Sequence, residues 1–304
     1  MTSIIKIKSY LPYNKLNTYK KFKEKYNRDF FINKIGTTHV RRVPKKNNEV
    51  VVDMCVEAFK KLNIKNKKKI KVIILCTQNP DYGGLPHNSA IIQNRLKKIS
   101  NNIDHNVACF DISLGCSGYI YCLKLIQTFL KYGEQGLIFT CDPYSKIIKP
   151  GDSNTELLFG DAATASLVIN NNNKIEYEFH TYGEYFQNLI KNNGILHMNG
   201  RKIFNFCLDN IPPLLNKFLK KNDLKIDQIK SFYFHQGSKY IIKSIAKKMH
   251  LKNYQIPIFL DQIGNTVSSS IPLTMELHNF NKRKKPIILC GFGVGLSISI
   301  CLIS

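Results

Sequence analysis

Phe110-Asp111-Ile112-Ser113-Leu114-Gly115-Cys116-Ser117-Gly118-Tyr119 is the stretch around which the rest of the chain is organised. The apolar run over residues 106–113 predicts a buried strand, and residues 117–131 have the length and apolar spacing of a helix. Cys116 therefore lies in a glycine-bounded turn at a helix N-terminus, where free N–H groups and the helix dipole favour a thiolate. Two interpretations stay open from this stretch alone, a nucleophile or a small buried cysteine in a tight join.

Outward from this stretch, apolar spacing predicts strands and helices in alternation. The predicted helices cover residues 50–62, 86–99, 203–221, 237–249 and 266–280, and the predicted strands cover residues 70–76, 136–141, 166–169, 229–235, 256–260, 286–290 and 296–303. Residues 30–42 are predicted to form a loop. This alternation indicates an α/β protein built from βαβ units with parallel sheet. The second half repeats the order of the first, so we divide the chain into residues 1–172 and 173–304.

Length and composition narrow the class of protein. The chain has 304 residues, of which 43% are hydrophobic, enough for a sizeable core. No apolar run reaches the ~18 residues of a membrane span, and the N-terminus lacks the pattern of a signal peptide. The nine cysteines are an odd number without a C-x-x-C pair, which argues against a disulfide framework or a metal site and for the reducing cytoplasm.

The charge of the chain is strongly basic, with a formal net charge of +24. Nucleic-acid binding is one interpretation of such a charge. The lysines are scattered through the whole sequence beside abundant Asn and Ile, so we expect no nucleic-acid partner and keep a non-catalytic binding protein as a remote alternative. An acidic protein partner fits the charge equally well.

Two polar residues are candidates to act with Cys116. His235 ends an apolar strand, and functional groups gather at the carboxyl ends of strands in α/β sheets. Asn265 lies in a Gly-Asn-Thr turn. Each also has a structural interpretation, as a satisfied core histidine and as a helix N-cap. Together with the glycine turn over residues 291–295, which offers backbone donors, Cys, His and Asn suit acyl transfer followed by carbanion chemistry.

The chain resembles the β-ketoacyl-acyl-carrier-protein synthase III family of the thiolase superfamily. The segments that carry the resemblance are FINKIGTTHVRR from Phe31, FDISLGCSGY around Cys116, FGDAATASLV around Asp161, FHQGSKYIIKSIAKK from Phe234, GNTVSSSIPL from Gly264 and GFGVGLS from Gly291. They occur in the order of the family and cover nearly the full chain. The resemblance implies a five-layered αβαβα sandwich of two similar halves, a homodimer, and an acyltransferase of fatty acid biosynthesis.

The resemblance also implies the mechanism. Cys116 would take an acyl primer from a thioester, with the backbone N–H groups of Cys116 and Val294 as the oxyanion site. His235 and Asn265 would donate hydrogen bonds to the thioester oxygen of malonyl-carrier protein while CO₂ leaves. The resulting enolate would attack the acyl group and give a β-ketoacyl product. No bound cofactor or metal is expected; acyl-CoA or acyl-carrier protein and malonyl-carrier protein are the expected substrates.

Further residues are carried over from the family. Leu85 would close the acyl pocket across the dimer, and the apolar bulk of Phe292 would favour loss of the carboxylate. Phe30 and Lys34 would bind the carrier of the primer, at positions where a Trp and an Arg are common in the family. Because the chain has no Trp, the identity of that carrier stays open, as does a specialised role.

The acidic carrier protein is expected on a basic helix face. Its predicted contacts are Lys243, Lys247 and Lys248, of which the first two are at i, i+4 spacing. The same residues also fit a merely solvated face. An alternative function on the same fold is transfer of the acyl group to a hydroxyl or an amine without condensation.

Overall fold

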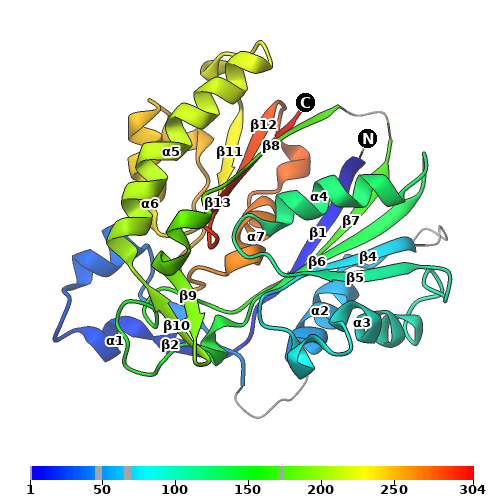
Figure 1. The fold of residues 1–304 in the computed structure, drawn as a ribbon, viewed down its shortest axis with the longest axis horizontal. Helices are drawn as coiled ribbons and strands as arrows, with labels where there is room; N and C mark the ends of the chain where they lie inside the picture. Colours follow the sequence, from blue (N-terminus) through cyan, green and yellow to red (C-terminus); the bar gives the residue numbers. More distant parts are fainter. Residues whose placement is uncertain (1, 45–49, 65–69, 172–173) are drawn as a thin grey trace.

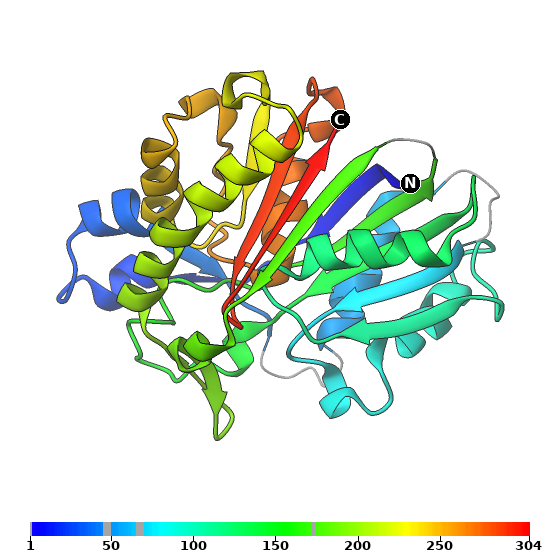
Figure 2. The ribbon, with the colours of Figure 1, turned by 45° about the horizontal axis from the view of Figure 1, so that its top comes forward.

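The computed structural model describes residues 2–44, 50–64, 70–171 and 174–304, and Figures 1 and 2 show its ribbon from two sides. Two β-sheets lie at its centre with helices around and between them. No helix in these ranges is long and apolar enough to cross a membrane. All nine cysteines are free thiols.

The first sheet has five strands in the order β1-β7-β6-β4-β5. These strands are β1 (Thr2–Tyr10), β7 (Ala163–Asn170), β6 (Gln135–Cys141), β4 (Ile70–Cys76) and β5 (Ala108–Ile112). β4 is parallel to β5 and β6, whereas β7 is antiparallel to its neighbours β6 and β1. Within the described ranges β5 pairs with β4 alone and is thus an edge strand.

The second sheet has four strands in the order β11-β12-β13-β8. They are β11 (Ser231–Phe234), β12 (Ile287–Gly293), β13 (Ser297–Ile303) and β8 (Ile175–Thr181). Only β11 and β12 are parallel. The prediction of parallel sheets was therefore wrong for four of the seven pairings in the two sheets. The turn between β12 and β13, for example, is a tight hairpin, and such a turn joins antiparallel strands.

Six helices complete five layers. They are α2 (Val50–Leu62), α3 (Asn88–Lys97), α4 (Gly118–Phe129), α7 (Ser270–Leu277), α5 (Gly200–Lys221) and α6 (Lys239–Lys248). α2 and α3 pack on the outer face of the first sheet and share one hydrophobic core with it. α5 and α6 pack on the outer face of the second sheet around another core. A third core places α4 and α7 between the two sheets. The predicted αβαβα sandwich is confirmed.

The smaller elements are where prediction was weakest. Residues 30–42 are not a loop: they contain a π-helix, η1 (Phe30–Ile35), and a short strand, β3 (His39–Arg41), which pairs with β2 (Lys15–Asn17) beside α1 (Thr18–Phe22). Residues 256–260 form no strand. A hairpin of β9 (Leu189–Asn192) and β10 (Ile195–Met198) was not predicted.

The two sheets divide the chain near its middle. The first sheet is built from residues 2–170 and the second from residues 175–303. The predicted boundary between residues 172 and 173 lies outside the described residues.

Candidate active site

Cys116 lies in the turn between the end of β5 and the start of α4, as the sequence predicted. The turn is closed by a hydrogen bond from the N–H of Gly118 to the carbonyl of Gly115, at 2.8 Å. Gly118 must be glycine because a Cβ there would overlap the sulfur of Cys76. The side chain of Cys116 is only 4% exposed.

The hairpin between β12 and β13 clamps this turn from the other half of the chain. Ser299 Oγ donates to the carbonyl of Ser117 at 2.9 Å, and the hydroxyls of Ser117 and Ser297 are 2.8 Å apart. A Cβ on Gly293 would lie 2.6 Å from the sulfur of Cys116, so only glycine leaves room for the thiol. Gly291 and Gly293 of this hairpin thus allow close packing against the cysteine turn.

The environment of the thiol differs from the sequence-based expectation. Burial raises the pKa of Cys116 to about 12, although hydrogen bonds from the backbone N–H groups of Val294 and of Cys116 itself lower it in part. The expected thiolate is therefore not the resting state, because desolvation outweighs the helix N-terminus. Both predicted oxyanion donors nevertheless converge on the sulfur.

His235 follows β11 directly, at the carboxyl end of that strand. Its Nδ1 is 2.6 Å from Ser270 Oγ, and its ring contacts the ring of Phe292 edge-on, with centroids 5.4 Å apart. Burial lowers the pKa of His235 to about 3, and the carbonyl of Val267 opposes this shift only in part. The imidazole is therefore neutral at physiological pH. The direction of the hydrogen bond between Nδ1 and Ser270 depends on the tautomer: if the Ser270 hydroxyl donates to Nδ1, the ring proton is on Nε2.

Asn265 is held in a fixed orientation by the backbone. Its N–H donates to the carbonyl of Leu158 at 2.8 Å, and its side-chain Oδ1 accepts the N–H of Val267 at 2.9 Å. Because this acceptor contact identifies the oxygen of the amide, the side-chain NH₂ is the end left to face the cavity. Asn265 is thus presented as a hydrogen-bond donor.

Val267 links the two candidate donors. Its N–H orients Asn265 and its carbonyl faces the ring of His235. Its φ of 53° is in the left-handed region, which branched side chains rarely adopt. Such a conformation persists only where the surroundings impose it, and Val267 is fully buried.

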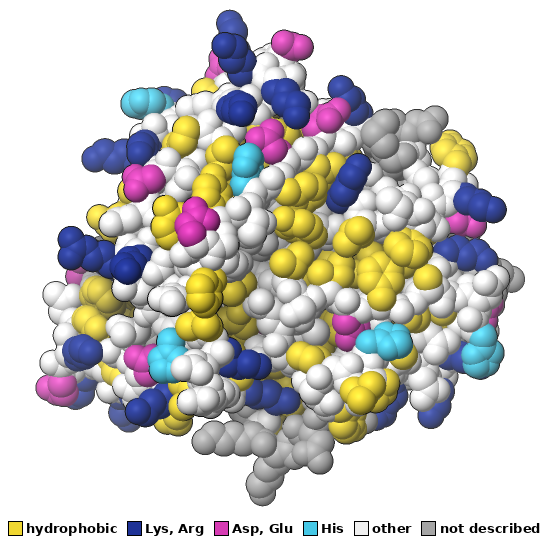
Figure 3. Space-filling view, in the orientation of Figure 1, with side chains coloured by type: hydrophobic (Ala, Val, Ile, Leu, Met, Phe, Trp, Pro, Cys, Tyr) yellow, Lys and Arg dark blue, Asp and Glu magenta, His cyan; other side chains and the backbone are white. Residues whose placement is uncertain are grey.

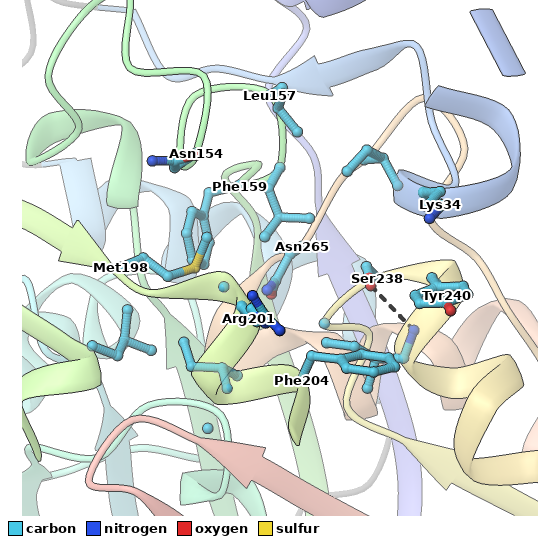
Figure 4. A pocket seen from close by; sticks show the side chains of 18 of the residues that line it. Lys34, Asn154, Leu157, Phe159, Met198, Arg201, Phe204, Ser238, Tyr240 and Asn265 are labelled. Atoms are coloured by element: carbon cyan, nitrogen blue, oxygen red, sulfur yellow. Dashed lines mark hydrogen bonds between the residues drawn. The ribbon is translucent and has the colours of Figure 1, made fainter. Parts of the chain in front are cut away.

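Cys116, His235, Asn265 and Phe292 line one cavity of about 490 Å³. Its walls are mostly apolar, and Figure 4 shows Leu157 and Phe159 pointing into it from one loop and Met198 from the end of β10. A cavity of this size and lining, with a few convergent polar groups, is typical of a small-molecule site. The cysteine, histidine and asparagine predicted from three separate αβ units therefore meet.

Phe30 and Lys34 lie at the mouth of the same cavity, both on η1. The Phe30 ring stacks on Tyr26 with centroids 4.3 Å apart, and Lys34 Nζ lies 4.7 Å from the centre of the Tyr240 ring. Tyr240 stacks in turn on Phe204, at 5.1 Å. The mouth is thus aromatic and basic, although the chain has no Trp.

The remaining predicted residues lie apart from the cavity. Leu85 is 86% exposed and does not line the cavity of its own chain. Lys243, Lys247 and Lys248 lie on α6, whose first turn reaches the cavity mouth. Lys243 Nζ donates to Asn253 Oδ1 at 2.6 Å, and Lys248 Nζ donates to the carbonyl of Leu208 at 2.8 Å.

Several residues of the site were not predicted. Arg201 and Phe204 enter the cavity from the start of α5, as Figure 4 shows, and no sequence motif pointed to them. Ser270 and Val267 were part of the segment that carries the family resemblance, but nothing in that segment predicted a left-handed valine.

A buried cysteine lies at a strand–helix turn between two sheets and lines one cavity with a neutral histidine and an oriented asparagine. This fold and this site define the class, a thiolase-like enzyme. Comparison with known proteins agrees. Residues 110–183 match the family model 3-Oxoacyl-[acyl-carrier-protein (ACP)] synthase III, and residues 219–304 match the model of its C-terminal part.

Relatives extend this match over most of the chain. The chain is 31% identical over 283 residues to "Beta-ketoacyl-[acyl-carrier-protein] synthase III" of Clostridium botulinum (strain Okra / Type B1), covering 84% of each, and 28% identical over 288 residues to the protein of that name in Lactobacillus helveticus, covering 86% of each. A crystal structure of 3-oxoacyl-(acyl-carrier-protein) synthase III, 28% identical, superposes with a TM-score of 0.90 over 99% of each chain. The Aquifex aeolicus enzyme, 25% identical, gives 0.87 over 100% of this chain and 99% of that one.

The chain therefore belongs to the 3-oxoacyl-[acyl-carrier-protein] synthase III family. It is a condensing enzyme of the acyltransferase class, and the resemblance stated from the sequence is confirmed.

Proposed function

We propose that the chain joins an acyl primer to malonyl-carrier protein by decarboxylative condensation. In the first half-reaction Cys116 Sγ attacks the thioester carbonyl of the primer, the carrier thiol leaves, and the thiol proton passes overall to that leaving sulfur. The N–H groups of Val294 and Cys116 are placed to stabilise the oxyanion of the tetrahedral intermediate. Because burial raises the pKa of Cys116, the thiol is protonated at rest and must lose its proton in this half-reaction.

In the second half-reaction His235 Nε2–H and the Asn265 NH₂ donate to the thioester oxygen of the malonyl group. The carbon–carbon bond to the carboxylate breaks, CO₂ leaves, and the enolate attacks the acyl-Cys116 carbonyl. The bond from that carbonyl to sulfur breaks, and the Cys116 thiolate takes a proton. Phe292, 1% exposed and against His235, keeps this region apolar, which favours loss of a carboxylate.

The observation that carries this proposal is the pairing of a neutral histidine with an oriented amide across the cavity from the cysteine. Transfer of the acyl group to a hydroxyl or an amine would use the same acyl-cysteine but leave the two donors without a role. The deciding experiment incubates the enzyme with an acyl primer and malonyl-carrier protein and analyses the product by mass spectrometry. A β-ketoacyl product with release of CO₂ supports condensation; an ester or amide formed without CO₂ would replace it.

We infer that two copies assemble through the face that carries β5 and α4. Among the described residues, one edge of β5 has no neighbouring strand. α4 exposes Leu125 (37%) and Phe129 (47%), and the ring of Phe129 contacts that of Phe110, with centroids 5.1 Å apart. Figure 3 shows hydrophobic side chains gathered on this face. Open edges and apolar patches of this kind are covered in stable proteins.

The division into halves of residues 1–172 and 173–304, and a cytoplasmic location, stay predictions.

Leu85 is expected to select the primer from within such a dimer. It lies in the loop before α3 and is 86% exposed in the single chain, so its side chain is available to a second copy. Leu85→Phe will shift loading toward acetyl, and Leu85→Ala toward longer or branched acyl groups. Each methylene that is newly accommodated or excluded changes the preference by about fourfold, from ~0.8 kcal/mol per buried CH₂. Competitive loading of mixed acyl thioesters, read by intact mass, measures the shift.

Two controls make this test decisive. Tyr254→Ala removes another exposed apolar side chain, 76% exposed, and should leave the preference unchanged. Sedimentation velocity of each variant establishes that two copies are present. If dimers of both Leu85 variants load primers with wild-type preference, Leu85 does not line the pocket.

We propose that the acidic carrier docks on the face of α6 that carries Lys243, Lys247 and Lys248. The helix carries Lys247 and Lys248 in its exposed last turn and reaches the cavity mouth at Tyr240, so a carrier held there could deliver its acyl arm to the cavity. Lysines and arginines are otherwise spread over the surface, as Figure 3 shows for one face. Attraction of opposite charges speeds association and weakens as salt rises.

Reversing both charges, Lys247→Glu with Lys248→Glu, will slow the carrier-dependent step about tenfold at low salt. The rate with a small malonyl thioester will stay near that of the wild type. The matched control reverses Lys220 and Lys221, which occupy the same last-turn position on α5 and carry the same interaction with the helix dipole. Equal losses in both double variants, or with both substrates, would contradict docking at α6.

A further inference from the structure

A buried carboxyl group that the condensation does not use lies beneath the active site. Asp142 follows β6 and is completely buried. Its Oδ1 accepts the backbone N–H of Gln78 at 2.6 Å, and its Oδ2 accepts the backbone N–H of Ser268 at 3.3 Å. In the part of the chain that the structure describes, no Lys, Arg or His forms an ion pair with it.

One of these two contacts leads to the nucleophile. The Gln78 side chain, which accepts the Tyr144 hydroxyl at 2.7 Å, packs directly against Gly115: a Cβ on Gly115 would lie 2.6 Å from Gln78 Oε1. Gly115 immediately precedes Cys116. Asp142 therefore supports the turn that carries the thiol, through Gln78.

The other contact leads to the two donors. Ser268 follows Val267, whose N–H fixes the Asn265 amide at 2.9 Å and whose carbonyl faces the His235 ring. Because Val267 is held in a left-handed conformation, its neighbours must keep the backbone in place. The Asp142 side chain holds this backbone in place by accepting the N–H of Ser268, the residue after Val267.

We propose that Asp142 is a positioning residue for the condensation, which holds the nucleophile turn and the donor turn in fixed relation across the two halves of the chain. This inference rests on the proposed function. Burying a carboxylate without a neighbouring cation costs free energy of folding. The alignment of the two turns is the functional gain that offsets this cost.

The charge of Asp142 also gives the inference a measurable signature. The titratable groups that face it are Cys76 at the end of β4, Cys116, Cys141 in β6 and Tyr144. Burial raises the pKa of Asp142 to about 6, so it is ionised at pH 8, where its negative charge helps to raise the pKa of Cys116. Removing that charge therefore lowers the pKa of the thiol.

The test is Asp142→Asn, which keeps the shape of the side chain but removes its charge. The new NH₂ group cannot accept a hydrogen bond, so the N–H of either Gln78 or Ser268 loses its acceptor. Between pH 7.5 and pH 9.5, alkylation of Cys116 by iodoacetamide, followed by peptide mass spectrometry, should become several-fold faster, since one pKa unit changes the thiolate fraction about tenfold. Decarboxylation of malonyl-carrier protein should become slower, with kcat down about 10- to 100-fold and KM unchanged, because the donors lose their alignment.

The matched control is Asp81→Asn. Asp81 is an equally buried carboxylate, 2% exposed, but it accepts N–H groups from the first turn of α2 on the outer face of the first sheet. Its loss should lower thermal stability without changing Cys116 alkylation or kcat. Cys109, the half-buried thiol, is the internal reference in each digest.

Opposite changes in the two rates, seen only in Asp142→Asn, support the positioning role. The inference is overturned if this variant has wild-type kcat, if Asp81→Asn loses kcat equally, or if Cys55 and Cys122 become alkylated together with Cys116, which reports loosening of the fold. If the wild type releases no CO₂ from malonyl-carrier protein, the proposed function fails. The alkylation arm then decides by itself whether Asp142 acts on Cys116.

Discussion

Cys116→Ala will abolish covalent loading of the enzyme by acyl thioesters. Cys116 carries the only thiol among the described residues that line the cavity, and two backbone N–H groups converge on its sulfur. These donors can stabilise the oxyanion that forms when the sulfur attacks a thioester carbonyl. The fold should persist, because the substitution removes one small buried atom. The measurement is intact mass after incubation with short acyl-CoA and acyl-carrier thioesters, where wild type gains one acyl group and the variant gains none.

The control for this result is Cys109→Ala. Cys109 lies in β5 and is the one cysteine that is not buried, so it is the thiol most open to adventitious acylation. Loading of Cys109→Ala should equal that of wild type. Stoichiometric acylation of Cys116→Ala at another cysteine would contradict the assignment of the nucleophile.

His235→Ala and Asn265→Ala will each accept an acyl group normally and fail in the second half-reaction. Loss of one preorganised donor to a developing oxyanion costs about 10²–10³ in rate, or about 2.7–4 kcal/mol. The neutral state of His235 is essential to this role, and its lowered pKa of about 3 keeps it neutral above pH 5. Protonation of His235 therefore contributes no loss of decarboxylation between pH 8 and pH 5, and any loss near pH 6 is expected from protonation of Asp142.

Release of CO₂ from malonyl-carrier protein measures this step separately from loading. His278→Ala is the matched control, since His278 contacts Tyr233 through its Nδ1 at 2.9 Å and lies outside the cavity. Near wild-type release by His235→Ala or Asn265→Ala would remove that residue from the proposed mechanism.

Local patterns in the sequence were sufficient for much of the fold. The apolar spacing of residues 50–62 and the apolar run of residues 70–76 predicted α2 and β4 with the bounds that the structure has. These elements are specified by their own residues, because a helix face or a buried strand needs apolar side chains at a fixed period. Strand direction in the sheets was not predictable in the same way, since it depends on which strands meet across long stretches of chain.

The sequence by itself determined the chemistry of the site: a cysteine between glycines, a histidine at a strand end and an asparagine in a Gly-Asn-Thr turn. Only the tertiary structure decided the protonation states and the orientation of these side chains. Burial between two sheets makes Cys116 a neutral thiol and His235 a neutral donor, against what the helix N-terminus and an exposed imidazole would give. Left-handed Val267 and buried Asp142 align them through backbone contacts. The physical reason is that desolvation and long-range backbone contacts arise only when distant segments pack together, and no local pattern records them.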